Sequence, residues 1–449
     1  MKSVISIGNQ DFISIRKNNC FYIDKTDFIR EWWDNQDSVT LITRPRRFGK
    51  TLNMSMVEYF FSVNHSECSK YFEDLVIWKE ERFRKLQGTY PVISLSFADI
   101  KATTYETARR AVIRKLVKLY STFEFVKSSK VLNEKDRAYF DSVEENMSDD
   151  AAAVAVNYLS DYLSRYYGKK VIILLDEYDT PLQESYIHGY WENLTAFIRS
   201  LFNSTFKTNP YMERGLLTGI TRVSKESIFS DLNNLEVVTT TSEKYSGSFG
   251  FTEEETKQTL EYYDLSLNDE VKSMYDGYHF GEHDIYNPWS ILNYASRKVL
   301  EPYWVNTSSN TMIKKAISSS DEAFERGYEE LIRNGKLETT VKMDTSFFEV
   351  NNTENLWGLL VNAGYLTLHK TISIQDSLYI IKIPNQEVQL EFRKLTAYHL
   401  KATETDLTVL FNSLKRCKKE DFENHRSRRR DHSCFGSGIS SHGELFSQE

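Results

Sequence analysis

Short apolar runs alternate with segments whose apolar residues repeat at helical spacing through the first 250 residues. Continuous apolar runs bounded by polar turns predict buried strands, and apolar residues at every third or fourth position predict helices that pack on a core. The predicted strands span 38–43, 90–97, 169–179 and 215–221, and the predicted helices span 50–61, 105–125, 148–168 and 191–206. This alternation predicts an α/β fold in which helices cover both faces of a parallel sheet.

The pattern changes beyond about residue 250, where helix-like segments separated by turns with aromatic residues predict smaller α or α+β domains. We therefore divide the chain into a first domain over 1–250, a helical or winged-helix-like region over 251–395 and a remainder over 396–449. From Lys415 to Arg430 there are eight basic and three acidic residues, and the final stretch has no periodicity and few large apolar residues. We expect this basic tail to be disordered.

Composition narrows the class of protein. With 40% hydrophobic residues in 449, the chain can bury large cores, and its net charge of -8 argues against a globally basic nucleic-acid protein. The four cysteines lie far apart without a C-x-x-C pair, which favours a reducing compartment over a disulfide scaffold. The N-terminus lacks the apolar core of a signal peptide, and no window is apolar enough to span a bilayer. We expect a cytoplasmic protein with no membrane segment.

The segment "TRPRRFGKT" (43–51) joins the first predicted strand to the first predicted helix. It ends as the phosphate-binding loop G-x-x-x-x-G-K-S/T ends, although Arg44 stands at the first glycine position. In such a loop, backbone N–H groups and the lysine contact phosphates, and the final hydroxyl binds Mg²⁺. The alternative is an exposed basic turn. The candidate residues for binding ATP are Arg44, Pro45, Arg46, Arg47, Phe48, Gly49, Lys50 and Thr51, with Thr51 also a metal ligand.

A second candidate element is the apolar run "VIILLDEYD", which ends in Asp176 and Glu177. This is the form of a Walker B strand, in which the aspartate holds Mg²⁺ through water and the glutamate orients or deprotonates the attacking water. Acidic residues at a strand end also serve solubility, but the loop and this pair together predict a Mg²⁺·ATP site. At the end of the predicted strand 215–221, Thr221 could sense the γ-phosphate and Arg222 could act as an arginine finger. A strand end with a surface arginine is the alternative there.

Several segments together resemble the bacterial AAA-ATPase-like family. They are "FYIDKTDFI", "TRPRRFGKT", "VIILLDEYD", "GLLTGITRVSKESIFSDLNNL", "MYDGYHF", "IYNPWSILNY", "LLVNAGYLT" and "IPNQEV", from about residue 5 to about 395. The family's loop is commonly R-P-R-R-F-G-K-S/T, so the resemblance implies that Arg44 is a family trait. It also implies a P-loop NTPase in which Lys50 and Thr51 bind phosphate and Mg²⁺. The segment "YIDKT" (22–26) could place Asp24 or Lys25 near the nucleotide, or hold the N-terminal segment against the sheet.

Members of that family typically carry a C-terminal PD-(D/E)XK nuclease-like domain, which needs carboxylates and a lysine around Mg²⁺. Nothing after residue 384 supplies this set, so we expect that part to be absent or truncated, with 396–449 its remnant. The D-x-K of "ADIK" (98–101) is interpreted as structural, as are His279 and His283. The tail's His425, His432, Cys434 and His442 match no standard zinc spacing.

The main hypothesis is an Mg²⁺-dependent ATPase. One alternative is a nucleotide-gated interaction module that binds ATP without useful turnover. The other is a nucleic-acid-processing protein whose nuclease domain is lost. The protein or nucleic-acid partner and the oligomeric state stay open, although an intersubunit role for Arg222 would imply a ring or dimer.

Overall fold

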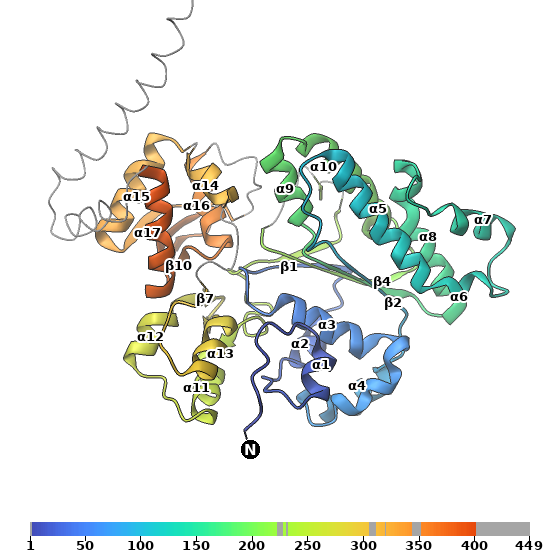
Figure 1. Cartoon of the computed structure of the whole chain (residues 1–449), viewed down its shortest axis with the longest axis horizontal. Helices are drawn as coiled ribbons and strands as arrows, with labels where there is room; N and C mark the ends of the chain where they lie inside the picture. The colour runs from blue at the N-terminus through green and yellow to red at the C-terminus, as the bar shows by residue number, and fades with distance from the viewer. Residues whose placement is uncertain are drawn as a thin grey trace, which may run out of the picture.

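A parallel five-stranded sheet in the order β2-β3-β4-β1-β5 lies at the centre of the chain (Figure 1). The computed structural model describes residues 2–221, 228–229, 232–304, 311–318, 320–343 and 352–400. The strands are β1 Val39–Thr43, β2 Val92–Ser96, β3 Val171–Asp176, β4 Met212–Gly219 and β5 Leu235–Val238. The first four match the predicted strands, whereas β5, a short edge strand, was not predicted.

Helices cover both faces of this sheet because successive strand residues point to opposite sides. Leu41 belongs to the core on one face and the next residue, Ile42, to the core on the other. The first core contains α5 Tyr105–Thr122, α6 Glu124–Lys127, α7 Glu134–Ser142, α8 Asp149–Tyr167, α9 Thr180–His188 and α10 Trp191–Phe202. The second contains α1 Phe12–Lys17, α2 Asp27–Asn35, α3 Lys50–Phe61, α4 Glu81–Leu86 and the 3₁₀ turns Val63–Tyr71 and Val76–Lys79.

The predicted helices are present, with ends set by local capping. The Ser148 side chain accepts a hydrogen bond from the N–H of Ala151 at the start of α8, and Gly168 ends that helix at a φ of 64°. The helix predicted over 191–206 ends at Phe202 and continues as a π-turn, Asn203–Lys207. Within the described part of the chain, no helix is both long and apolar enough to cross a membrane.

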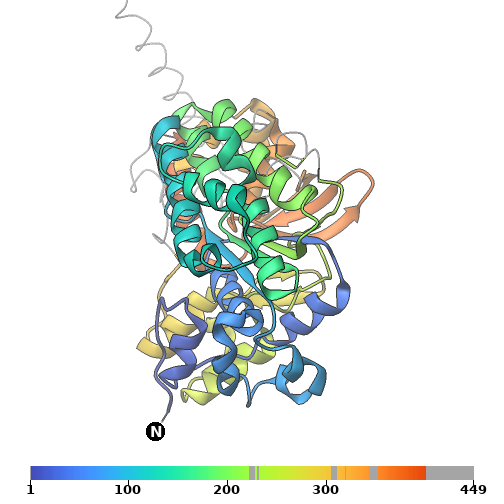
Figure 2. The same cartoon turned by 90° about the vertical axis from the view of Figure 1, so that its right-hand side faces the viewer.

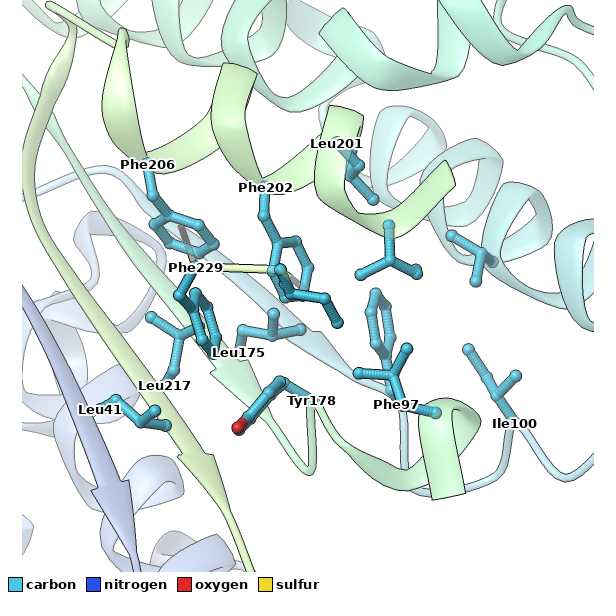
Figure 3. Close-up of a cluster of buried hydrophobic side chains, with 14 of the residues drawn as sticks. Leu41, Phe97, Ile100, Leu175, Tyr178, Leu201, Phe202, Phe206, Leu217 and Phe229 are labelled. Atoms are coloured by element: carbon cyan, nitrogen blue, oxygen red, sulfur yellow. The ribbon is translucent and has the colours of Figure 1, made fainter. Parts of the chain in front are cut away.

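An apolar layer between the sheet and α10 fixes the segment that follows β3 (Figure 3). The Tyr178 ring is fully buried and lies 5.4 Å from the ring of Phe229, which stacks on Phe202. The Tyr178 hydroxyl donates a hydrogen bond to the carbonyl oxygen of Thr221 at 2.7 Å. This hydrogen bond and these ring contacts hold the chain just after Asp176, so the acidic end of β3 has a defined position.

The described residues after 250 form two small antiparallel sheets with helices. One sheet has the order β6-β8-β7 and the other β10-β11-β9. The first group comprises β6 Phe251–Thr252, α11 Glu253–Tyr262, α12 Asp269–Tyr275, β7 Tyr278–Phe280, β8 His283–Tyr286 and α13 Pro288–Arg297. The second comprises α14 Thr311–Ser318, α15 Glu322–Asn334, β9 Lys336–Thr340, α16 Thr353–Asn362, β10 Thr367–Ser373, β11 Leu378–Lys382 and α17 Gln386–Leu400. In Figure 2 the β10–β11 hairpin extends outward from the body.

Candidate nucleotide site

The loop 44–49 joins the carboxyl end of β1 to the first residue of α3. Gly49 precedes the helix at a φ of 83°, a conformation that glycine adopts without steric cost. The Lys50 Nζ donates hydrogen bonds to the carbonyl oxygens of Arg44 at 2.9 Å and Pro45 at 3.0 Å. Among the described residues no side chain caps the start of α3, so its first N–H groups stay available to an anion.

The two residues predicted to bind the metal, Thr51 and Asp176, lie side by side in the structure. The Asp176 carboxylate, at the end of β3, accepts hydrogen bonds from the hydroxyls of Thr51 and Thr218. Burial raises the pKa of Asp176, and both hydrogen bonds oppose that rise. Only 5% of Asp176 is exposed, so it lies behind Thr51 and not on the open surface of the site. This arrangement suits an aspartate that reaches a metal through water.

Glu177 follows at the surface of the site with a φ of 50°, an uncommon backbone conformation for a residue with a side chain. Its Oε2 accepts a hydrogen bond from the Thr180 hydroxyl at 3.2 Å. Burial lowers the pKa of Lys50, while the negative charges of Glu177 and Asp176 raise it. The Lys50 ammonium therefore lies close enough to the carboxylates of Glu177 and Asp176 to interact with them electrostatically.

Arg44 does not present its side chain to this site. Its Nη1 donates to the carbonyl oxygens of Thr43 at 2.9 Å and Val238 at 3.3 Å, and its guanidinium lies over the Phe280 ring at 5.0 Å. Arg44 is fully buried, and burial lowers its pKa to about 9. Arg44 was predicted to help bind ATP, but its guanidinium does not reach the cavity, because β5 and the aromatic residues Phe249 and Phe280 enclose it. The carbonyl of Arg44 faces Lys50 instead.

Residues after 250 also hold the rest of the loop. The Phe48 ring packs edge-on against Tyr278 with 5.0 Å between centroids, and the Arg47 guanidinium lies 4.2 Å from the centre of the Trp289 ring. Gly364 approaches Pro45 so closely that a Cβ on Gly364 would stand 2.9 Å from the Pro45 Cβ. We call these the loop contacts. They connect the loop to α13, β7 and the segment after α16.

A cavity of 470 Å³ opens over the loop, a size that suits a small-molecule ligand. The predicted loop residues Arg46 to Thr51 line it, and Glu177 lies on its wall. The wall also carries apolar side chains, mostly from the N-terminal segment and α13: Ile5, Ile7, Phe21, Ile23, Phe251, Pro288, Trp289 and Leu292. Lys25 and Lys101 add positive charge to the wall. The cavity wall therefore carries both cationic and apolar side chains.

Thr221 does not face the cavity. It is fully buried, and its N–H and hydroxyl both donate to the Asp179 Oδ2, at 3.1 and 3.3 Å. On this strand the threonine that bonds to Asp176 is Thr218, three residues before Thr221, and it was not among the predicted site residues. Both threonines lie in "LLTGITR". The sequence therefore indicated a polar residue at this strand end, but not which of the two threonines contacts Asp176. Arg222 lies outside the described residues.

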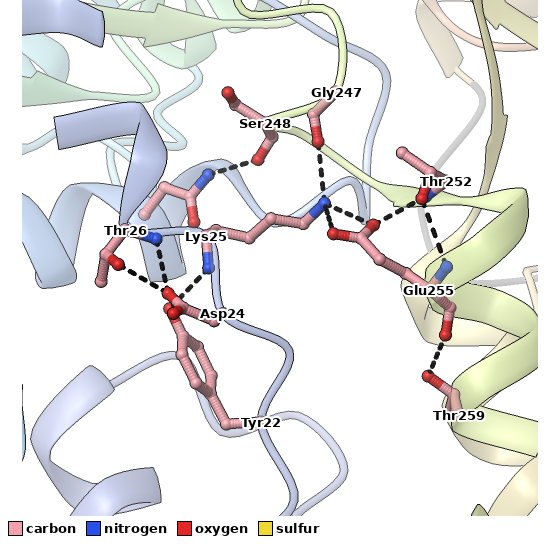
Figure 4. A network of polar contacts seen from close by, with 10 residues as sticks. Tyr22, Asp24, Lys25, Thr26, Gly247, Ser248, Thr252, Glu255 and Thr259 are labelled. Carbon is pink, nitrogen blue, oxygen red and sulfur yellow. Dashed lines mark hydrogen bonds and ion pairs between the residues drawn. The ribbon is translucent and has the colours of Figure 1, made fainter. Parts of the chain in front are cut away.

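The "YIDKT" segment joins the N-terminal chain to α11 (Figure 4). The Lys25 Nζ pairs with the Glu255 carboxylate at 2.6 Å and donates to the Gly247 carbonyl at 2.8 Å. The Asp24 Oδ1 accepts from the N–H and hydroxyl of Thr26 at 2.8 and 2.6 Å. Lys25 therefore lines the cavity and joins this segment to Gly247 and α11, while both roles given for the segment stay predictions.

The remaining predictions fall away from the site or outside the structure. Asp99 of "ADIK" pairs with Lys115 at 2.6 Å, in keeping with a structural role, although Lys101 lines the cavity. His279 Nδ1 lies 2.6 Å from the Asp284 carboxylate. The basic tail and its histidines and cysteine lie outside the described residues.

The decisive geometry is a lysine-bearing loop at a helix start beside a threonine-bonded aspartate. Residues 6–229 match the AAA-ATPase-like family. That family is described as a predicted AAA-ATPase, and the match covers both Lys50 and Asp176. A protein of Azotobacter chroococcum mcd 1, named only as an uncharacterized protein in the vnfD 5′ region, is 26% identical over 397 residues, covering 86% of this chain and 68% of that protein. This family match over residues 6–229 supports nucleotide binding.

Proposed function

We propose that this protein binds ATP in the cavity over the loop and hydrolyses it. The observation that carries the proposal is the placement of Lys50 and Thr51 beside Asp176, with Glu177 on the cavity wall. The loop and the acidic pair come from different strands, and an exposed basic turn would not produce this convergence.

The triphosphate would lie at the end of the cavity formed by the loop. Lys50 would exchange its bonds to the Arg44 and Pro45 carbonyls for phosphate oxygens, and the N–H groups at the start of α3 would contact the same phosphates. Arg46 and Arg47 line this end and add positive charge. The nucleoside would then contact the apolar side chains of the N-terminal segment and α13 that line the cavity.

The hydroxyl of Thr51 and the carboxylate of Asp176 are oxygen donors of the kind that Mg²⁺ prefers, so they would hold it here. Bound Mg²⁺ would neutralise charge on the terminal phosphates. Glu177 would orient a water toward the γ-phosphorus and accept its proton as the new P–O bond forms. The bond to the β-phosphate oxygen breaks, and ADP and inorganic phosphate leave.

Two substitutions test binding and turnover separately. Lys50→Ala should abolish ATP binding in an equilibrium titration, whereas Lys118→Ala, an exposed lysine on α5, should not. Glu177→Gln should keep ATP binding but lose phosphate release. Its control is Glu184→Gln, which changes another carboxylate on the cavity wall and should keep turnover. Wild-type ATP affinity in Lys50→Ala would show that the site is assigned wrongly.

The loop contacts favour a second candidate, a nucleotide-gated interaction module. Arg47 touches α13 through Trp289 and Phe48 touches β7 through Tyr278, so a change in the loop would reach the residues after 250 directly. In that case ATP binding alone would alter the C-terminal half, and Glu177→Gln would behave as the wild type does. Phosphate release measured with and without DNA, RNA or protein partners separates this candidate from the ATPase.

A further inference from the structure

The β10–β11 hairpin and β9 carry three lysines on one face of their sheet. Lys336 pairs with Lys382 across β9 and β11, and Lys370 of β10 pairs with Ile380 of β11. Directly paired residues share a face, and so do alternate residues of one strand such as Ile380 and Lys382. All three lysines therefore lie on the same face. The opposite face is buried through Leu337 and Ile381.

This lysine face (Lys336, Lys370 and Lys382) is electrostatically positive. Within the described part of the chain, none of the three lysines forms an ion pair, and each lowers the pKa of the neighbouring His369, after burial as the larger cause. The register places one acidic residue, Glu338, on this face, and Asp376 in the hairpin turn bonds to Ser373. The lysines thus outnumber the nearby carboxylates and point toward an anionic partner.

The tip of the hairpin is apolar. Ile372 is 42% exposed and Ile374 is 78% exposed, among the highest values for a large apolar side chain in the described residues. A single exposed isoleucine is ordinary on a protein surface. Here, however, the exposed pair lies at the turn end of β10, in a hairpin that projects from the body (Figure 2). The lysine face belongs to the same sheet. A small anion or an acidic peptide would satisfy the lysines and leave this tip unused.

We propose that the hairpin enters a groove of B-form duplex DNA, with the lysine face on the phosphates and Ile374 in the groove. The B-form major groove admits a two-stranded β-ribbon, whereas the deep, narrow major groove of duplex RNA does not. At about 3.3 Å per residue, the Lys370 row lies about 7 Å from the Lys336–Lys382 row, far enough to reach separate phosphates. Residues 355–362 of α16 are all buried, so that stretch cannot serve as a reading helix.

The test uses the full chain, without nucleotide, and a fluorescein-labelled 20-base-pair DNA duplex in anisotropy titrations at several salt concentrations. The triple variant Lys336→Ala, Lys370→Ala, Lys382→Ala should bind at least about tenfold more weakly, and its log K against log salt slope should fall by about 2 to 3. The matched control, Lys118→Ala, Lys130→Ala, Lys257→Ala, removes three exposed lysines elsewhere and should bind as the wild type does. Ile374→Ser should weaken binding without changing the salt slope.

The basic stretch 415–430 is present in every variant, so its contribution cancels. All the substituted lysines are at least partly exposed, and an unchanged melting temperature would confirm that the variants fold. The proposal is overturned if the wild type does not bind the duplex, or if the triple variant binds as tightly as the wild type. It is also overturned if the control triple loses as much affinity, or if duplex RNA of the same sequence binds as well as DNA.

Discussion

A single methyl group at Gly364 would test whether the C-terminal half positions the nucleotide loop. Gly364 has a φ of 86°, and a Cβ there would stand 2.9 Å from the Cβ of Pro45, inside the contact distance of two carbon atoms. The proline ring cannot rotate out of the way, so Gly364→Ala must move either the loop or the segment after α16. Because the Pro45 carbonyl holds Lys50, the displacement should reach the phosphate site.

The cost has two parts. An alanine in the left-handed region costs about 1 to 2 kcal/mol. Steric overlap in a packed interior adds about 1 to 3 kcal/mol. Gly335 provides a matched control, because its φ is 71° and an added Cβ would meet nothing within 4 Å. Gly335→Ala should therefore pay only the first part, and the difference between the two variants measures the contact with Pro45.

Denaturant unfolding should show Gly364→Ala less stable than Gly335→Ala by about 1 to 3 kcal/mol. Titration with a fluorescent ATP analogue should show affinity at least about tenfold lower for Gly364→Ala, equivalent to about 1.4 kcal/mol, and unchanged for Gly335→Ala. Equal stability and equal nucleotide affinity in the two variants would refute the idea that this contact supports the loop.

Three further predictions concern buried polar groups. Burial raises the pKa of Glu387 from 4.5 to about 7, so between these pH values the folded chain keeps a proton that the unfolded chain loses. The free energy of unfolding should therefore fall by up to ~3 kcal/mol as the pH rises from 4.5 through 7. Glu387→Gln should remove this fall, as measured by thermal unfolding at pH 5 and pH 8. Arg44→Met, which removes a charge but keeps an apolar stem, should be at least as stable as the wild type, whereas Arg44→Ala should be less stable than Arg44→Met by ~2 to 4 kcal/mol in denaturant unfolding. Thr218→Val deprives Asp176 of a hydroxyl donor and should cost ~1 to 3 kcal/mol in the same assay; a smaller loss than in Ser96→Ala, on the edge strand β2, would contradict it.

The order of strands, loop and acidic pair could be predicted from the sequence because each is a local pattern. Gly49-Lys50-Thr51 follows a buried run and starts a helix, and Asp176 ends the strongest apolar strand. Local pattern could not give the direction of the Arg44 side chain, which depends on Phe249 and Phe280, far away in the sequence.

The same limit explains the other differences. Thr218 and Thr221 stand on one strand end, and only the packing around Asp179 decides which of them meets Asp176. Much of the apolar wall of the cavity comes from residues 5–10 and α13, which lie some 280 residues apart and carry no joint motif. Local sequence patterns indicate the chemistry of neighbouring residues. They do not indicate a cavity wall that is formed by segments far apart in the sequence.

The loop contacts have a consequence for anyone who would trim this protein. The region that matches the family ends at residue 229, yet Arg44, Arg47 and Phe48 rest on aromatic rings between residues 249 and 289. A fragment that stops at the family boundary would leave a buried guanidinium and a phenylalanine open to water. Its nucleotide affinity would describe a different loop, because the smallest piece able to report on this site extends at least through Gly364.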